Sequence, residues 1–205
     1  MAERSETPND APDTPPIGRG EHARRRVLTA ALDQLAEEGA SRFTMDAVAA
    51  RAHASKATLY RRWPTAAALV VEAMGSTFRP IPTPDTGDTR RDLHQLLHAA
   101  VHLLTASPFP RLLAAVIDLA ERDPSLAATH ADLTARQRSP LLEVIIRGQR
   151  TGQIPADTDP DVLADLLAAP LFYRRFIAHQ PIPAGFIDSI IDQVLAPAPL
   201  ATRTE

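Results

Sequence analysis

The sequence predicts an all-α fold that is divided into two helical domains, and three observations support this class. Hydrophobic residues make up 44% of the 205 residues, enough for a core, whereas aromatic residues make up only 4%. Apolar residues recur at the spacing of amphipathic helices along most of the chain, and strand-like runs are scarce. Three prolines and a glycine over residues 80–87 separate a shorter first set of helices from a longer second set.

Both ends of the chain predict disorder. Residues 1–20 hold four prolines and few apolar side chains, and residues 197–205 form a polar, proline-rich tail. The chain has no cysteine, and we find neither a signal peptide nor a run of 18 apolar residues. We therefore expect a cytoplasmic protein with no membrane contact, no disulfide and no cysteine-based zinc site.

The first domain is expected to span residues 21–81 and to begin with a long helix. Apolar residues repeat along one face of this helix, and Gly39 should end it. The apolar face consists of Val27, Leu28, Ala31, Leu32 and Leu35.

Two short helices should follow. Thr44 is placed to cap a helix over residues 45–52, and Ser55 is placed to cap the next helix. Their hydroxyl groups can accept hydrogen bonds from the free N–H groups of a first turn. His53 and Ala54 leave only a tight turn between the two helices.

The third helix should end near Trp63. Leu59 and Trp63 lie four residues apart, so both should face the interior. Pro64 prevents smooth continuation because it lacks an N–H group. A fourth helix is expected from about residue 65 to residue 77.

Two short helices joined by a tight turn and braced by a longer helix describe a helix-turn-helix unit, whose second helix enters the DNA major groove. The exposed residues of that second helix must be short polar or basic groups. They are Lys56, the only lysine of the chain, then Thr58, Tyr60, Arg61 and Arg62. Residues 39–63 carry five basic side chains and one acidic one, a local balance of +4 in a chain of net charge −3. Such a cluster neutralises phosphates and drives sequence-independent DNA affinity.

Two longer segments carry a family resemblance. They are Thr44-Met45-Asp46-Ala47-Val48-Ala49-Ala50-Arg51-Ala52 and Ser55-Lys56-Ala57-Thr58-Leu59-Tyr60-Arg61-Arg62-Trp63-Pro64. This motif, over residues 44–63, resembles the DNA-binding domain of TetR-family transcriptional regulators, and the resemblance covers about residues 21–81. It implies an all-helical homodimer with a three-helix DNA-binding head and a larger helical domain that binds a small molecule. Most such proteins are repressors that leave their operator when the ligand binds.

The resemblance also implies roles for single residues. Thr44 would meet a phosphate as well as cap its helix, and the Tyr60 hydroxyl would hold another phosphate. Lys56, Ala57 and Thr58 would lie near base edges and flanking phosphates. The full set of expected DNA-binding residues is Thr44, Ser55, Lys56, Ala57, Thr58, Tyr60, Arg61 and Arg62.

Two positions depart from the family pattern. His53 stands where the turn usually has glycine, and His tolerates a positive φ better than most residues, so slight strain is expected. Ala66 stands where the fourth helix usually has a lysine that meets a phosphate. Because of these two changes, a DNA-binding head that has lost its function stays an alternative.

The second domain is expected over residues 82–196. Its helices are expected near residues 89–106, 109–121, 125–151, 159–179 and 183–195. Pro140 and Pro170 fall inside the third and fourth of these. Each proline either kinks its helix or begins a new one.

Three segments of the second domain are similar to one TetR C-terminal subfamily. They are Gly148-Gln149-Arg150-Thr151-Gly152-Gln153-Ile154-Pro155, Asp159-Pro160-Asp161 and Ala169-Pro170-Leu171-Phe172-Tyr173-Arg174-Arg175-Phe176. In that subfamily the last two helices pack against their copies in a partner subunit. The apolar stripe expected at this interface comprises Phe186, Ile187, Ile190, Ile191 and Val194, and an internal core stripe is the alternative.

The candidate ligand-binding residues are aromatic, acidic or imidazole side chains of the second domain. Phe172, Tyr173 and Phe176 would line a pocket or belong to the core. Asp118, in an apolar run, would bind a cationic effector or face water.

Three histidines form a further candidate site. His94, His98 and His102 lie on one helix face, where imidazoles can share a metal. No cysteine or carboxylate cluster completes the site, so we expect neither a metal nor a cofactor. The alternatives are a ligand hydrogen bond or a pH effect, with His98 and His102 as the candidate ligand-binding residues, or plain half-exposed packing.

The sequence therefore predicts a sequence-specific DNA-binding transcriptional regulator and not an enzyme. It is expected to be a homodimeric repressor that an unknown small-molecule effector releases from a palindromic operator on the bacterial nucleoid. An activator or architectural protein without an effector is one alternative. A metal-dependent enzyme using the three histidines is another, disfavoured because we find no nucleophile–base pair, phosphate loop or complete metal motif.

Overall fold

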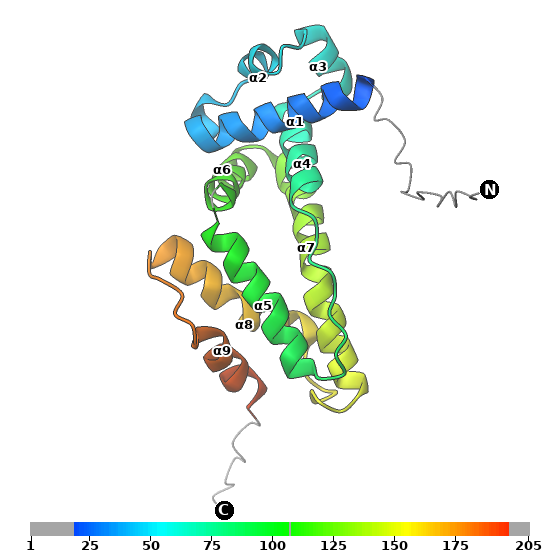
Figure 1. The fold of residues 1–205 in the computed structure, drawn as a ribbon, viewed down its shortest axis with the longest axis vertical. Helices are drawn as coiled ribbons and strands as arrows, with labels where there is room; N and C mark the ends of the chain where they lie inside the picture. Colours follow the sequence, from blue (N-terminus) through cyan, green and yellow to red (C-terminus); the bar gives the residue numbers. More distant parts are fainter. Residues whose placement is uncertain (1–18, 107, 197–205) are drawn as a thin grey trace, which may run out of the picture.

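The computed structural model describes residues 19–106 and 108–196, which are mainly helical (Figure 1). In chain order the elements are α1 (Arg19–Glu38), a short 3-10 helix η1 (Ala40–Arg42), α2 (Met45–Arg51), α3 (Lys56–Arg62), α4 (Ala66–Thr77), α5 (Thr89–Thr105), α6 (Phe109–Arg122), α7 (Pro124–Arg150), α8 (Pro160–Phe172), a one-turn π-helix η2 (Tyr173–Ile177) and α9 (Phe186–Leu195). These two ranges contain no β-strand, which confirms the predicted all-α class.

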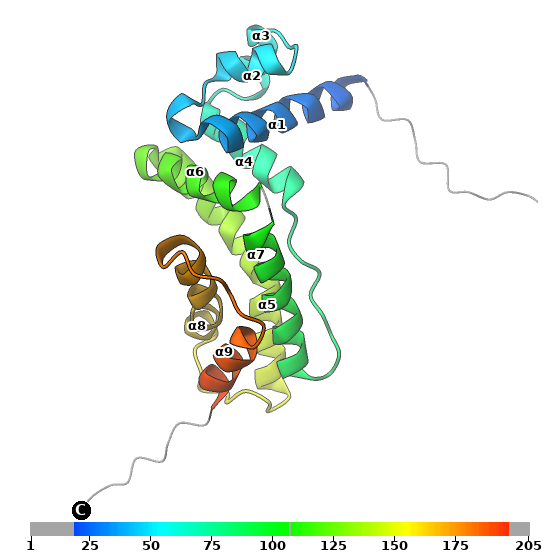
Figure 2. The ribbon, with the colours of Figure 1, turned by 60° about the vertical axis from the view of Figure 1, so that its left-hand side comes forward.

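Helices α1 to α4 form a head at one end of an elongated molecule, and α5, α8 and α9 lie toward the other end (Figures 1 and 2). Helix α6 lies across the middle, directly beneath α1, and the long α7 reaches from α4 to α8. Residues 79–88 run without a helix alongside the body from α4 to α5. The predicted division between residues 81 and 82 falls in this segment.

Two large apolar cores hold the molecule together. The first contains side chains of α1 to α4 and also Leu112 and Val116 of α6 and Leu133 of α7. The second lies among α5, α7, α8 and α9. Phe109 of α6 packs against both cores, and its ring meets the Phe78 ring edge-on with 4.7 Å between centroids. Helices α6 and α7 therefore contribute to both the head core and the body core.

The helix boundaries follow the predicted signals at most positions. Gly39 follows the last residue of α1 and has a φ of +76°, which suits glycine. Helix α1 begins at Arg19, two residues before the predicted start and inside the segment predicted to be disordered. The rest of that arm and the predicted tail lie outside the described residues. Pro140 falls within one continuous α7 and does not begin a new helix.

The end of the chain differs from the prediction. The helix expected over residues 159–179 ends as α8 at Phe172 and continues for one π turn, in which the Ala178 N–H donates to the Tyr173 oxygen at 2.9 Å. His179 has a φ of +50°, which stops the helix. Pro181 and Pro183 cannot donate a backbone hydrogen bond, so α9 begins only at Phe186.

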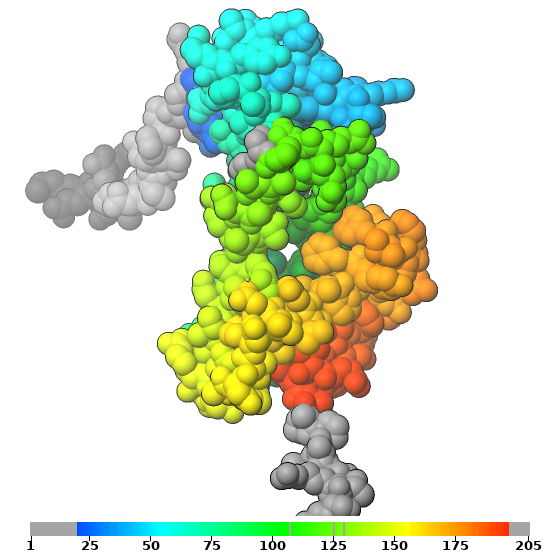
Figure 3. Space-filling view, turned by 180° about the vertical axis from the view of Figure 1, so that it is seen from behind, coloured from blue at the N-terminus to red at the C-terminus, as the bar shows by residue number. Residues whose placement is uncertain are grey.

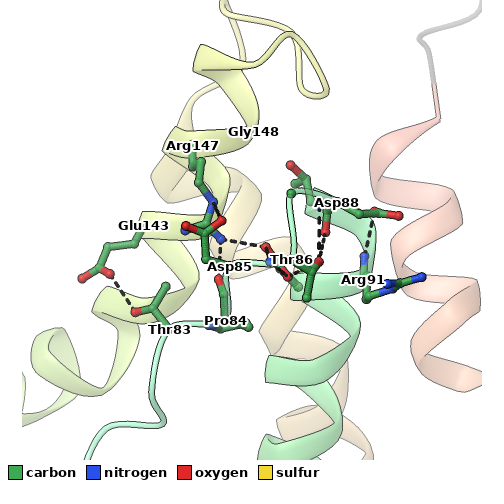
Figure 4. Close-up of polar contacts among 12 residues, drawn as sticks. Thr83, Pro84, Asp85, Thr86, Asp88, Arg91, Glu143, Arg147 and Gly148 are labelled. Carbon is green, nitrogen blue, oxygen red and sulfur yellow. Dashed lines mark hydrogen bonds and ion pairs between the residues drawn. The ribbon is translucent and has the colours of Figure 1, made fainter.

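The segment between α4 and α5 is fastened to the body by a buried ion pair (Figure 4). The Asp92 carboxylate of α5 has no solvent exposure and accepts hydrogen bonds from the Thr86 hydroxyl at 2.7 Å and from Arg147 of α7 at 2.7 Å. Arg147 also donates to the Pro84 carbonyl oxygen. Burial alone would raise the pKa of Asp92, but the Thr86 hydrogen bonds and the Arg147 charge outweigh it and lower that pKa.

Among the described residues, no single helix is long and apolar enough to cross a membrane. Only α5 and α6 taken together, bent by 84° at their junction, reach that length and hydropathy.

Candidate nucleic-acid interface

The turn between α2 and α3 is built from two capped helix starts. The Thr44 hydroxyl accepts the Ala47 N–H at 3.2 Å, and the Ser55 hydroxyl accepts the Thr58 N–H at 3.2 Å. Both predicted caps are confirmed. His53, in the turn, has the positive φ that its family position suggested, at +50°.

The inner face of α3 is anchored by Leu59 and Trp63. Both are buried, and Trp63 is only 2% exposed. The Trp63 indole N–H donates to one Glu72 oxygen at 2.7 Å, and the other Glu72 oxygen accepts Arg24 Nε at 2.6 Å. One carboxylate of α4 therefore ties the end of α3 to α1. The Arg62 guanidinium lies 5.4 Å from the centre of the Trp63 ring, within cation–π distance.

Glu72 was not predicted as part of this site. A buried indole N–H usually requires an acceptor, and Glu72 is the only acidic residue of α4. These two facts together are the sequence signal that points to Glu72.

The outer face of α3 carries the side chains expected to meet DNA. All of the following are exposed: Lys56, Ala57, Thr58, Tyr60, Arg61 and Arg62. Thr44 and Ser55 are exposed as well. The Ser55 and Thr58 hydroxyls lie 2.8 Å apart and share a hydrogen bond. Their contacts with bases or phosphates remain predictions.

Two of the five basic residues counted in the sequence are paired with acids. Lys56 Nζ lies 2.6 Å from Asp46 Oδ2 of α2. The Arg51 guanidinium lies 2.7 Å from a Glu37 oxygen and 3.9 Å from a Glu38 oxygen of α1. Both glutamates precede the window of residues 39–63 in sequence but adjoin it in space. The local balance of +4 therefore overstates the free positive charge of this surface.

The other three basic residues are arginines. Within residues 19–106 and 108–196, Arg42, Arg61 and Arg62 form no ion pair, and all three are exposed. Among the five basic residues of this window, they are the side chains most available to phosphates.

The candidate ligand-binding residues do not converge on one site. Tyr173 is exposed, and the Phe172 ring stacks on the Phe176 ring with 6.2 Å between centroids at the end of α8. Asp118 pairs with Arg122 on the surface of α6 at 2.8 Å. Phe176, which is partly buried against the body core, is the member of this set with core contacts.

The three histidines line an open hollow of about 520 Å³ on α5, together with Gln95 and Ala99. The His94 and His98 rings are 6.1 Å apart, and His94 Nε2 lies 3.6 Å from an Asp188 oxygen. His98 and His102 are exposed. Within the described part of the chain, no three His, Cys, Asp or Glu side chains are grouped as a metal would require.

Three residues of the predicted dimer stripe on α9 lie in the core of their own chain, as the internal-core alternative expected, and a dimer through this helix stays a prediction. Ile187, Ile190 and Ile191 are buried in the core of their own chain, and Ile191 has no exposed surface. Phe186 and Val194, at the edge of the same helix, are half-buried.

An exposed apolar stripe lies on α8 and η2 instead. Val162, Leu166, Tyr173 and Ile177 follow one another at helical spacing, and each is between 53% and 68% exposed. Val162, Leu166 and Tyr173 border an open hollow of about 610 Å³, whose lining also includes Pro170 and Phe186. Exposed apolar side chains gathered in one stripe usually mark an interaction surface.

The capped helix pair, its anchored α3 and the exposed arginines define a DNA-binding protein of the helix-turn-helix class. Residues 27–73 match the model of bacterial regulatory proteins of the tetR family, and residues 83–194 match the model of the tetracyclin repressor-like C-terminal domain. The chain therefore belongs to the TetR family and is a DNA-binding transcriptional regulator.

Known relatives agree with this assignment. The chain is 33% identical over 183 residues to the DNA-binding transcriptional repressor TetR of Mycobacteroides abscessus, covering 87% of this chain and 95% of the relative. It is also 33% identical over 174 residues to the HTH-type transcriptional regulator Rv1556 of Mycobacterium tuberculosis, covering 84% and 85% of the two chains. Among solved structures, the chain resembles the crystal structure of the TetR family transcription regulator SCO0332, with 33% sequence identity and a TM-score of 0.66. The match covers 85% of this chain and 97% of that chain.

Proposed function

We propose that this regulator is a homodimeric repressor that a small molecule releases from a palindromic operator. The observation that carries the DNA-binding part is the exposed polar face of α3, flanked by arginines without acidic partners. The repressor assignment is supported by the relative of Mycobacteroides abscessus, which is a DNA-binding transcriptional repressor.

The proposed DNA contacts divide by chemistry. The Tyr60 hydroxyl and the arginines bind phosphates, because basic and hydroxyl groups fix the position of a protein on DNA without reading its sequence. Thr58 reads a base edge from the first turn of α3. Thr44 and Ser55 contact the backbone of the DNA beside the groove, and Ala57 contacts a thymine methyl group or leaves room for the base edges.

The proposed dimer forms through the exposed stripe of α8 and η2. Packing it against its copy would remove Val162, Leu166 and Ile177 from water in a two-fold arrangement. Two heads related by that symmetry would read two half-sites about one helical turn apart. This arrangement explains why the operator should be palindromic.

Helix α6 supports the proposed release mechanism. Its Leu112 and Val116 belong to the head core, its Leu113 packs on the body core, and its Phe109 packs on both. A ligand that binds in the body and shifts α6 would therefore also move the side chains of α6 that belong to the head core. Such coupling typically amounts to about 1–3 kcal/mol, and a ligand with equal affinity for both states would release nothing.

The proposed ligand site lies between α6, α7 and α8. Figure 3 shows an opening through the space-filling surface at this place, below α6 and beside α8. Phe176 follows α8 and is partly buried, so it is the candidate residue that we retain for this site. The structure gives no reason to retain Asp118, which is paired with Arg122 on the surface.

The experiment that tests this function is fluorescence anisotropy with DNA from immediately upstream of the protein's own gene, against scrambled competitor and at several salt concentrations. Tight binding that resists the competitor and weakens with salt supports the proposal. If that DNA fails, selection from a random duplex library replaces it. Failure to enrich any sequence would refute an operator-binding function.

Two variants then test the roles of single residues. Tyr60→Phe should weaken binding to operator and scrambled DNA by a similar factor, because a phosphate contact is independent of sequence. Thr58→Ala should weaken operator binding more than scrambled binding. Equal losses on both DNAs for Thr58→Ala would contradict a base-reading role.

A further inference from the structure

The lone lysine of the chain is held by an acidic side chain on the surface proposed to meet DNA. Lys56 begins α3, Asp46 lies in the first turn of α2, and Nζ is 2.6 Å from Oδ2. The Lys56 side chain is 64% exposed and the Asp46 side chain is 56% exposed. The pair therefore lies open to an approaching duplex. Its hydrogen bond raises the pKa of Lys56, and the Asp46 charge adds to the rise.

This pairing changes what Lys56 offers to DNA. A Lys and an Asp in contact carry no net charge, so together they add almost nothing to the attraction of phosphates. An ammonium group has three N–H donors, and the bond to Asp46 occupies one of them. The remaining two can still donate to a neutral acceptor, such as O6 or N7 of guanine in the major groove.

We propose that Asp46 makes Lys56 a reader of base edges instead of a phosphate contact, and so determines specificity by weakening binding to random DNA. The proposal rests on the proposed function, in which α3 enters the major groove of an operator. Affinity for random DNA comes almost entirely from cations on phosphates. Asp46 subtracts one such cation and also repels the backbone, while a base contact made by Lys56 on the operator is kept.

Asp46 also has a structural role, and the test must separate this role from an effect on DNA preference. An acidic residue in the first turn stabilises a helix, because the helix N-terminus is partly positive. This role alone predicts a change in protein stability without any change in DNA preference. The ion pair between Arg51 and Glu37 supplies a matched control, since Glu37→Gln also removes one exposed acid from the head and leaves Arg51 only the more distant Glu38.

The experiment uses the full-length protein and two DNA probes, a sequence enriched by the wild type from a random duplex library and its scrambled version. Wild type, Asp46→Asn, Lys56→Gln and Glu37→Gln are compared by anisotropy at several salt concentrations. Asp46→Asn should tighten binding to scrambled DNA by about two- to fivefold, the range expected for freeing an exposed charge. Its affinity for the enriched sequence should stay level or fall, so the ratio of the affinity for enriched DNA to the affinity for scrambled DNA falls. Lys56→Gln should weaken enriched binding more than scrambled binding.

The single lysine allows a direct second measurement. Labelling with ¹⁵N-lysine gives one side-chain ammonium signal in the NMR spectrum, because the chain contains no other lysine. Asp46→Asn should shift that signal and lower the pKa of Lys56, and the wild-type signal should keep its Asp46-bonded position on the enriched duplex.

Several results would overturn the inference. They are an equal gain on both DNAs for Asp46→Asn, the same loss of preference for Glu37→Gln, an equal loss on both DNAs for Lys56→Gln, or an ammonium signal unchanged by Asp46→Asn. Thermal unfolding of each variant shows whether a loss comes from misfolding. Lys56→Gln leaves Asp46 in place, so the helix-stabilising role of Asp46 in the first turn of α2 is unchanged in that variant. If the wild type enriches no sequence at all, the proposed function fails, and the two failures are thus distinct.

Discussion

Removing the Glu72 carboxylate should destabilise the head and detach the end of α3. In the structure Glu72 accepts the buried Trp63 N–H at 2.7 Å and Arg24 Nε at 2.6 Å. Glu72→Ala leaves that indole N–H without a partner, which costs about 1–3 kcal/mol. The Arg24 pair, whose side chains are 23% and 32% exposed, adds less than about 1 kcal/mol. We expect a loss of about 2–3 kcal/mol in the free energy of unfolding.

A double-mutant cycle with Trp63→Phe isolates the indole bond. Urea unfolding is followed by circular dichroism for the wild type, the two single variants and the double variant. Because phenylalanine has no N–H to orphan, Glu72→Ala should cost less than about 1 kcal/mol in that background. Glu37→Ala, which breaks the exposed Arg51 pair, serves as the control and should also cost less than about 1 kcal/mol. The same loss from Glu72→Ala in both backgrounds would show that the Trp63–Glu72 bond contributes nothing.

Three further predictions follow from other parts of the fold. Leu166→Glu on the exposed stripe of α8 should reduce the mass measured by light scattering to that of one chain with an unchanged helical spectrum, and a persistent dimer would place the interface elsewhere. Asp92→Asn should lower the free energy of unfolding by about 3 kcal/mol at pH 7, because it breaks a buried pair with Arg147. The folded pKa of Asp92 lies below its ordinary value of 3.8. The wild type should therefore exceed Asp92→Asn in free energy of unfolding above that pH, and this difference should shrink as the pH falls through the folded pKa. A difference that grows in acid would contradict this sign. His53→Gly should change stability by less than about 1 kcal/mol, whereas His53→Val at the same positive φ should lower it by more, as thermal unfolding can show.

The parts of the fold that local rules control could be predicted from the sequence. Thr44 and Ser55 cap their helices because the capping hydroxyl and the N–H that it accepts are three residues apart in the chain. The apolar face of α1 and the exposed outer face of α3 follow from helical periodicity in the same way. The positive φ of His53 could be expected because the family pattern has glycine there.

Features that depend on the approach of distant segments could not be predicted. The Arg51–Glu37 and Trp63–Glu72 bonds join residues 14 and 9 positions apart on different helices, so sequence counting placed Arg51 among the free cations and overlooked Glu72. The stripe on α9 correctly indicated a helix with one buried face. Periodicity cannot tell whether that face packs on its own chain or on a partner, and Ile191 packs on its own chain.

The apolar core that unites the head with α6 has a consequence for protein engineering. Leu112 and Val116 of α6 are fully buried among head residues, although a stretch of more than thirty residues separates them from the end of α4. A fragment cut near residue 81 would expose the apolar face of the head that normally packs against α6, and it should aggregate. Grafting the head onto another regulator would likewise require the recipient's counterpart of α6 to be redesigned, so specificity modules of this type are better exchanged by recoding α3 than by joining whole heads.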